Sequence, residues 1–277
     1  MSLFVDVDLA ATVEHAEADL TRASSRAIRR RQGVPAFQIP IAGGFATFSG
    51  PDSPFTKVVG AGFDGLPSDE ELGHVEHRFH THRAAVSFEV STLANPALVE
   101  LLTARGYLLA GFENVLLLSL ERLVLGVAAE VDGIEVRRGE DDLEVWLEVA
   151  VDAALSPDDA GVAQHETFPR VALEQGEMAV ADAGSRLYLA TVDGEPAGAA
   201  GVRFAGAIAQ LTGAGTLPRF RRRGVQKALA RARLQDAHAA GCRYAAVTTQ
   251  PGSTSHANMQ RAGFDLAYSR AVLVRAA

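Results

Sequence analysis

One stretch decides how this chain is interpreted: TLPRFRRRGVQKALARAR, residues 216–233. It overlaps the end of a short apolar segment, Ile208 to Leu217, that is typical of a strand and is ended by Pro218. The next turn holds three arginines and Gly224, and a helical pattern follows directly. A helix that begins after such a turn directs unpaired N–H groups and its positive dipole end at one point. The sequence therefore predicts an anion site here, most often for a phosphate.

The composition limits the class of protein. With 277 residues, 48% of them apolar, the chain can form the cores of one large domain or two ordinary ones. A net charge of −8 argues against a general nucleic-acid binder. Cys242 is the only cysteine, which excludes an internal disulfide framework and suits a reducing cytoplasm. The first residues do not form a signal peptide, and charges interrupt the most apolar region, 107–129, so we expect a cytoplasmic protein with no membrane contact.

Two segments 157 residues apart resemble each other. Aligning TARGYLLAGFENVLLL (103–118) with QRAGFDLAYSRAVLV (260–274) places Gly106 on Gly263 and Val115 on Val272. An apolar strand and a short helix precede each segment. Each half is therefore predicted to end as strand, helix, Gly-aromatic, strand, strand. The pattern favours a duplicated α/β domain with its boundary near residues 126–132.

The remaining patterns fit two such halves. The first half is predicted to contain a helix over 9–30, strands over 35–42, 44–48 and 57–63, and a helix over 68–80 that starts with a Ser68/Glu71 capping box. The second half is predicted to contain a strand over 134–137, helices over 141–154 and 170–175, a hairpin of strands 186–192 and 199–204, the strand 208–217 and the helix 224–240. Four histidines, His74, His77, His80 and His82, are read as a solvated helix face and not as a metal site.

The second half resembles the GNAT superfamily of acyl-CoA-dependent N-acyltransferases. The family motif, Arg/Gln-x-x-Gly-x-Gly/Ala at a helix start after the fourth strand, reads Arg221-Arg-Arg-Gly224-Val-Gln226 here, and Gln226 departs from it. A fifth strand over 244–249 and a helix that closes on Gly263-Phe264 complete the resemblance. It implies an α/β (α+β) fold of two tandem GNAT-like domains, 1–127 and 132–277, each a mixed, mostly antiparallel sheet flanked by helices. Only the second domain carries the CoA motif, because the matching turn of the first, 64–71, is acidic.

The resemblance also implies a function. We expect transfer of an acetyl group from acetyl-CoA to a primary amine of a small molecule, without a metal; the alternative is a non-catalytic acyl-CoA-binding or regulatory module. Backbone N–H groups of the arginine turn would hold the pyrophosphate, and one near Leu217 would polarise the thioester carbonyl. The expected cofactor-binding residues are Thr216, Leu217, Arg221, Arg222, Arg223, Gly224, Val225, Gln226, Lys227 and Asn258.

Acid and base residues are less clear from the sequence. Met259 occupies the position where many relatives carry a tyrosine acid, and Tyr268 and Ser255 are the candidates to replace it as proton donor. Packing and helix capping are the alternative explanations of these two residues. Residues 202–217 contain no carboxylate, which leaves the loop residues Asp158, Asp159, His165 and Glu166, or a water relay, as the base. A scaffold that binds an anionic partner through arginines 26–31 and 221–223 is a third hypothesis. The chain is expected to be a monomer or a homodimer.

Overall fold

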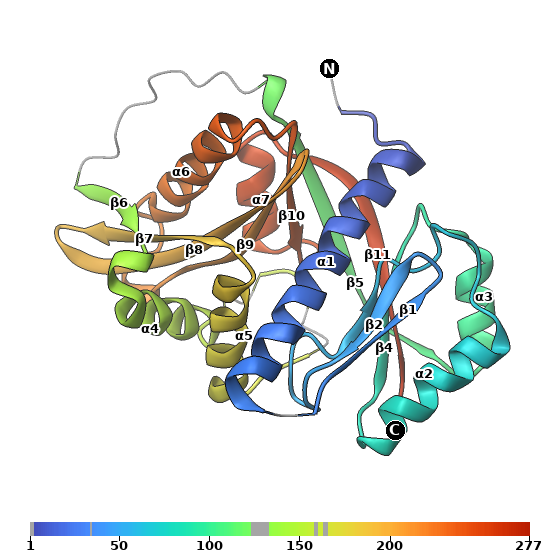
Figure 1. The fold of residues 1–277 in the computed structure, drawn as a ribbon. Helices are drawn as coiled ribbons and strands as arrows, with labels where there is room; N and C mark the ends of the chain where they lie inside the picture. The colour runs from blue at the N-terminus through green and yellow to red at the C-terminus, as the bar shows by residue number, and fades with distance from the viewer. Residues whose placement is uncertain (1–2, 34, 123–132, 158–159, 163–165) are drawn as a thin grey trace.

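The computed structural model describes residues 3–33, 35–122, 133–157, 160–162 and 166–277 (Figure 1). The first half contains α1 (Val7–Gln32), β1 (Phe37–Ile41), β2 (Gly44–Phe48), β3 (Lys57–Val59), α2 (Asp69–Thr81), β4 (Val86–Ser91), α3 (Ala97–Ala104), β5 (Leu108–Ser119) and the short helix η1 (Leu120–Arg122). The second contains β6 (Ile134–Arg138), η2 (Glu140–Asp142), α4 (Leu143–Ala154), α5 (Arg170–Asp182), β7 (Arg186–Val192), β8 (Glu195–Ala205), β9 (Ile208–Thr216), η3 (Pro218–Phe220), α6 (Val225–Ala239), β10 (Tyr244–Thr249), α7 (Thr254–Arg261) and β11 (Asp265–Arg275).

The strands form one sheet across both halves. The spatial order is β1-β2-β3-β4-β11-β5-β10-β9-β8-β7-β6. Neighbours are antiparallel except for β3 with β4 and β9 with β10, which are parallel. The mixed, mostly antiparallel sheet and its flanking helices confirm the predicted fold class. The predicted boundary, residues 126–132, lies outside the described residues.

The last strands of the two halves are exchanged. β11, from the end of the chain, lies between β4 and β5, whereas β5 lies between β11 and β10. Each half ends in one long strand, so the predicted strand-strand ending is wrong. The local pattern misled because each of these strands of eleven or twelve residues contains an irregularity, at Ala110 in β5 and at Ala267 in β11, that interrupts the alternation of side chains without ending the strand.

The pairing of β5 with β11 is symmetric about the repeat. Arg270 pairs with Glu113, and these two positions are themselves 157 residues apart. The rungs on either side are related by the same offset, since Val274 pairs with Leu108 where Asp265 pairs with Leu117. Even the irregularities match, because the register skips Ala267 on β11 and Ala110 on β5. The internal repeat predicted from the sequence is confirmed by this register.

Helices cover both faces of the sheet. Side chains alternate along β5, so that Leu116 and Leu118 meet the core beneath α6 and α7, and Val115 and Leu117 meet α1 on the opposite face. α1 crosses the middle of the molecule and packs against α5 of the second half (Figure 1). Arg31 and Asp182 form an ion pair between these two helices. The helix α1 therefore joins the halves, as the exchanged strands do.

Most predicted elements are observed within a few residues. The Ser68/Glu71 capping box of α2 is present, and β10 spans the predicted residues. Three predictions are wrong in length, one of them for β8, which begins at Glu195 and not at the predicted residue 199. β3 ends at Val59 and not at Phe63, because Gly60 and Gly62 adopt positive φ angles that leave the strand conformation. α5 continues to Asp182 because α1 packs along the part that the sequence pattern missed. Among the described residues, no helix is long and apolar enough to cross a membrane.

Candidate active site

The centre of the second half is a pair of parallel strands that separate. β9 and β10 pair through three residue pairs, of which Gln210 with Ala246 is the last. Both strands then continue, β9 to Thr216 and β10 to Thr249, without a further pair. Gly213, Ala214 and Thr248 are exposed although they lie on central strands. The gap between the two strand ends is therefore open to solvent.

A bulge turns the backbone of β9 at this gap. Thr212 pairs with Gly201 and Gly215 with Ala199, so Gly213 and Ala214 together stand opposite a single residue of β8. Gly213 has φ +40, in the left-handed region where glycine is favoured. A bulge of this kind takes backbone N–H and C=O groups out of the ladder and re-aims them. These groups become available to a ligand between the strands.

The arginine turn lies at the end of the same strand. Arg222 (φ 63) and Gly224 (φ 93) are both left-handed, and α6 starts at Val225 without a side-chain cap. The N–H of Arg221 donates to the Pro218 carbonyl (3.3 Å) and that of Ala228 to the Gly224 carbonyl (3.0 Å). Residues 222–227, all of them described, have no recorded acceptor for their N–H groups. Six backbone donors at a helix start have the geometry that suits an anion, and the anion site itself stays a prediction.

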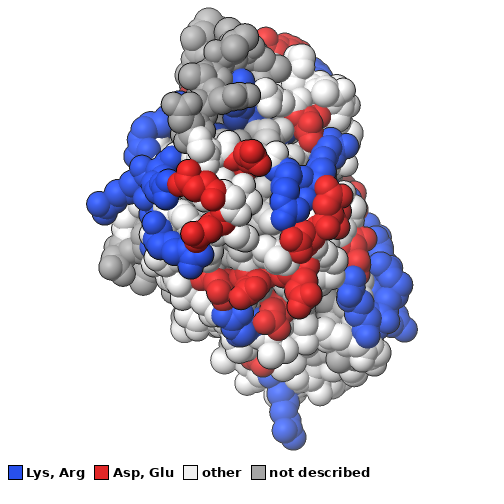
Figure 2. Space-filling model, turned by 90° about the vertical axis from the view of Figure 1, so that its left-hand side faces the viewer, with Lys and Arg blue, Asp and Glu red and all other residues white. Residues whose placement is uncertain are grey.

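The arginine side chains have local partners. The Arg221 guanidinium donates to the carbonyls of Thr216 (3.4 Å) and Ser156, which ties the loop after α4 to the end of β9. Arg223 pairs with Asp193 (2.8 Å). Figure 2 shows basic and acidic side chains intermixed over one face of the molecule. Arg222 and Lys227 are exposed, so their charges remain available to an anion at the turn.

Two of the residues expected to contact the cofactor, Leu217 and Asn258, already form hydrogen bonds within the protein. The Leu217 N–H donates to the Ala197 carbonyl (2.9 Å), so it does not offer the expected free donor to a thioester. Gly213 and Ala214, at the bulge, lie opposite a single residue of β8 and outside the regular ladder. Across the gap, the Asn258 side-chain amide donates to Gln226, and Arg261 donates to Asn258. The unusual Gln226 thus forms a bridge between α6 and α7.

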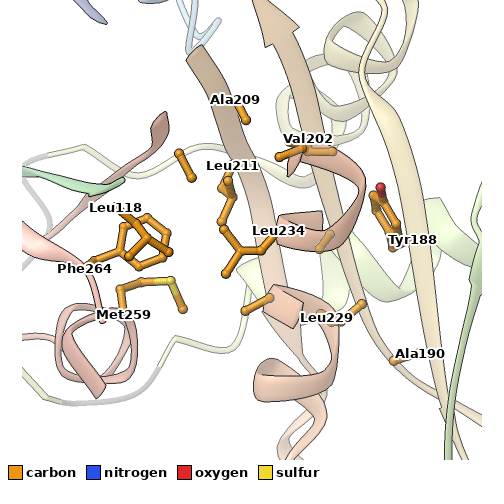
Figure 3. Close-up of a cluster of buried hydrophobic side chains, with 14 of the residues drawn as sticks. Leu118, Tyr188, Ala190, Val202, Ala209, Leu211, Leu229, Leu234, Met259 and Phe264 are labelled. Atoms are coloured by element: carbon orange, nitrogen blue, oxygen red, sulfur yellow. The ribbon is translucent and has the colours of Figure 1, made fainter. Parts of the chain in front are cut away.

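The structure distributes the expected acid and base residues differently. Tyr268 is buried, and its hydroxyl donates to Glu14 of α1 (2.7 Å). Burial raises the pKa of this phenol, with the Glu14 charge acting in the same direction. Ser255 is half-buried in the first turn of α7, and Glu166 lies before α5. Asp158, Asp159 and His165 lie outside the described residues. Met259 packs with Leu118 and Phe264 in the core (Figure 3).

Sequence reasoning missed two residues beside the gap: Glu177, which lies against β9, and His256, which lies against β10. Gly213 and Thr249 are each three residues beyond the last rung, Gln210 with Ala246. A methyl group on Gly213 would lie 2.8 and 2.9 Å from the carboxylate oxygens of Glu177 in α5. On the other wall, the Nδ1 atom of His256 is 3.3 Å from Thr249 Oγ1. The available signal was Thr212-Gly-Ala-Gly215, since glycine inside a strand marks a bulge or a close approach.

The corresponding region of the first half is closed. α2 starts with a capping box in which Glu71 accepts the Ser68 N–H (2.7 Å) and Ser68 accepts that of Glu71 (3.2 Å). The Asn95 N–H donates to the Gly62 carbonyl (2.9 Å), which joins the segments that follow β3 and β4. A methyl group on Gly62 would lie 3.0 Å from Leu98. The free helix start and the open gap occur together in the second half.

These features define a mixed α/β fold in which a helix start with unpaired N–H groups lies beside a separated strand pair. Residues 149–264 match the model of the Acetyltransferase (GNAT) family. Over these residues the chain is similar to the GNAT acetyltransferase family. In a sequence comparison with curated proteins, no relative matches.

Solved structures extend the similarity of fold to the whole chain. A GCN5-related N-acetyltransferase from Kribbella flavida has a TM-score of 0.63 at 18% identity, over 93% of this chain and 94% of that one. A tandem GNAT protein from the clavulanic acid biosynthesis pathway has a TM-score of 0.59 at 14% identity, over 94% and 95%. A GCN5-related N-acetyltransferase from Sphaerobacter thermophilus has a TM-score of 0.55 at 16% identity, over 100% and 95%. The chain has the fold of tandem GNAT proteins, and its acceptor is not identified.

Proposed function

We propose that the protein transfers an acetyl group from acetyl-CoA to a primary amine of a small molecule, at the gap between β9 and β10. The observation that carries this proposal is the row of unpaired N–H groups at residues 222–227, placed at the end of the separated strand. Such a row suits a pyrophosphate, because it supplies donors and a positive dipole without requiring a particular side chain. Exposed Arg222 and Lys227 add charge of the right sign.

Residues at both ends of the gap support the binding of a CoA ester there. Acetyl-CoA, when bound, supplies a thioester whose carbonyl carbon is open to attack. The turn at 222–227 would hold its pyrophosphate, and the bulge at Gly213 and Ala214 presents backbone groups where the thioester would lie. Ser255, His256 and Tyr268 are the groups near the β10 side that can carry a proton. Asn258 would contact the pantetheine arm after releasing Gln226.

A second candidate function is acyl-CoA binding without catalysis. The Gln226–Asn258 bridge favours it, because a side-chain link across the gap opposes passage of the arm. The burial of Met259, where many relatives carry a tyrosine acid, points the same way. Both functions need the same binding site, so they differ only in turnover.

Isothermal titration with acetyl-CoA tests the binding step. We expect saturable binding that weakens with salt, since the pyrophosphate contact is electrostatic. Absence of binding at millimolar acetyl-CoA would overturn both functions. Thiol release is then followed across a panel of primary amines. Release that depends on the amine supports acetyl transfer, and binding without release across the panel supports the second candidate.

A further inference from the structure

The Glu177 carboxylate has no partner among the residues that the structure describes. It lies in the middle of α5, half-buried, between the small residues Gly176 and Ala179 that pack against the first half. Its two oxygens contact the Gly213 position of the β9 bulge. No hydrogen bond or ion pair from the described residues reaches it. A buried carboxylate without a partner lowers the stability of the folded protein. Folding alone therefore gives no reason for a glutamate at this position.

The charged groups around Glu177 form hydrogen bonds and ion pairs with other residues. On α5 and α4, Arg170 pairs with Asp152 and with Glu174 (3.6 Å). On α1, Glu17 accepts from Gln210 (3.4 Å) and Arg31 pairs with Asp182. On β8, Arg203 donates to Gln210 (2.9 Å) and to the Ala16 carbonyl, and β9 has no ionisable residue. Burial alone raises the pKa of the Glu177 carboxyl to about 7.

We propose that Glu177 is the general base, which removes the proton from the acceptor ammonium group at the bulge of β9. This inference rests on the proposed function. The carboxylate takes one proton from the ammonium group, and the nitrogen lone pair that this frees forms an N–C bond to the thioester carbonyl carbon. The nitrogen then loses a second proton to water, and the C–S bond breaks with its electron pair on sulfur. The sulfur takes up a proton from water or from a neighbouring acid, and Glu177 returns its proton to water. A carboxylate that titrates near neutral pH suits this exchange.

The position of Glu177 places a carboxylate beside β9, although β9 itself carries none. The strand lacks any acidic residue, but its bulge leaves Gly213 without a side chain at the point where Glu177 approaches. Glu177 on one wall and His256 on the other then flank the gap three residues beyond the last rung. A proton can leave on one side and be supplied on the other.

The test compares Glu177→Gln with Glu174→Gln, a matched change one turn earlier on α5 that removes only an exposed ion pair. Thiol release from acetyl-CoA is measured between pH 5.5 and 9 with n-butylamine, which stays protonated over this range. We expect the first variant to lose at least about 100-fold in kcat with unchanged acetyl-CoA binding, and to lose the rise in rate near pH 7. The second variant should keep both. A Glu177→Gln enzyme within threefold of the unchanged protein, with the same pH profile, overturns the proposal.

A second measurement does not depend on turnover. Glutamate labelled with ¹³C at the carboxyl carbon is titrated by NMR, and the Glu177 signal is assigned by its loss in Glu177→Gln. Titration near pH 7, with a shift when acetyl-CoA is added, supports the base even if n-butylamine is not accepted. Titration in the ordinary range of glutamate with no response to acetyl-CoA overturns it. Failure of acetyl-CoA to bind at all would instead refute the proposed function.

Discussion

At the scale of single residues, the centre of the molecule depends on Arg270. Its guanidinium is 2% exposed, and it donates to Glu14 (2.8 Å) while lying 3.5 Å from both Glu89 and Glu113. Lys57 adds an ion pair with Glu89 (2.7 Å). These charges occupy the crossing of β5 and β11 beneath α1, where three carboxylates share one guanidinium and one ammonium group. Such a network specifies a single register more than it adds stability.

Glu113 is a member of this network whose pKa lies far from the ordinary value of a glutamate. Burial and the neighbouring Glu89 raise its pKa to about 7, although Lys57 and Arg270 oppose the shift. Between pH 4.5 and 7 the unfolded chain loses this proton while the folded protein keeps it, so the stability contributed by Glu113 falls as the pH rises. We expect Glu113→Gln to be more stable than the unchanged protein at pH 8 by about 2 kcal/mol, and equal to it near pH 4.5.

Urea unfolding at several pH values measures this difference. Glu121→Gln, a change at an exposed carboxylate beyond the end of β5, serves as the control and should show no such trend. A difference between Glu113→Gln and the unchanged protein that stays constant from pH 5 to pH 8 would contradict the assignment.

At the scale of elements, the first turns of α6 and α2 occupy corresponding places in the two halves but differ in their capping. α6 leaves its first N–H groups free, whereas α2 satisfies its own through Ser68 and Glu71. Gln226→Glu places a carboxylate in the first turn of α6, where the helix dipole favours a negative charge. The variant should therefore fold with unchanged or slightly higher Tm but lose acetyl-CoA binding by at least about tenfold, because the added charge repels the pyrophosphate.

Ser68→Ala is the control at the other helix start. It should cost about 1 kcal/mol of stability through the lost cap and leave acetyl-CoA binding intact. Calorimetric titration and thermal unfolding of both variants check the pair. If Gln226→Glu binds acetyl-CoA as tightly as the unchanged protein, the arginine turn is not the pyrophosphate site.

The sequence predicted what depends on neighbouring residues. The apolar strand, the glycine turn and the helix of residues 208–239 are local patterns, and the structure confirms them. The sequence did not identify Glu177 as a candidate, because a glutamate within a helix resembles a solvent-facing residue until the packing of α5 against β9 is known. The exchange of β5 and β11 could not be predicted for a related reason. Both halves carry the same strand pattern, so the local sequence does not determine which strands pair.

At the scale of the whole molecule, the first half contributes side chains that contact residues beside the open gap of the second half. β5 supplies Asn114, whose amide is 3.4 Å from His256 and whose oxygen accepts from Ser269 (2.7 Å). α1 supplies Glu14 to Tyr268. A half that is closed at its own helix start thus still positions groups beside the open gap. This gives a physical reason for both halves to occur in one chain.

The exchange also predicts how the halves behave when separated. A fragment of residues 132–277 lacks β5, which leaves β10 without its antiparallel neighbour and β11 without either partner. Unpaired central strands that carry apolar side chains do not persist in water. We expect no folded monomer of this fragment by size exclusion and circular dichroism. Co-expression with residues 1–131 should restore a one-to-one complex that binds acetyl-CoA. A 132–277 fragment that is monomeric, folded and competent in acetyl-CoA binding would show that the exchanged strands are dispensable, and that the predicted domains are independent.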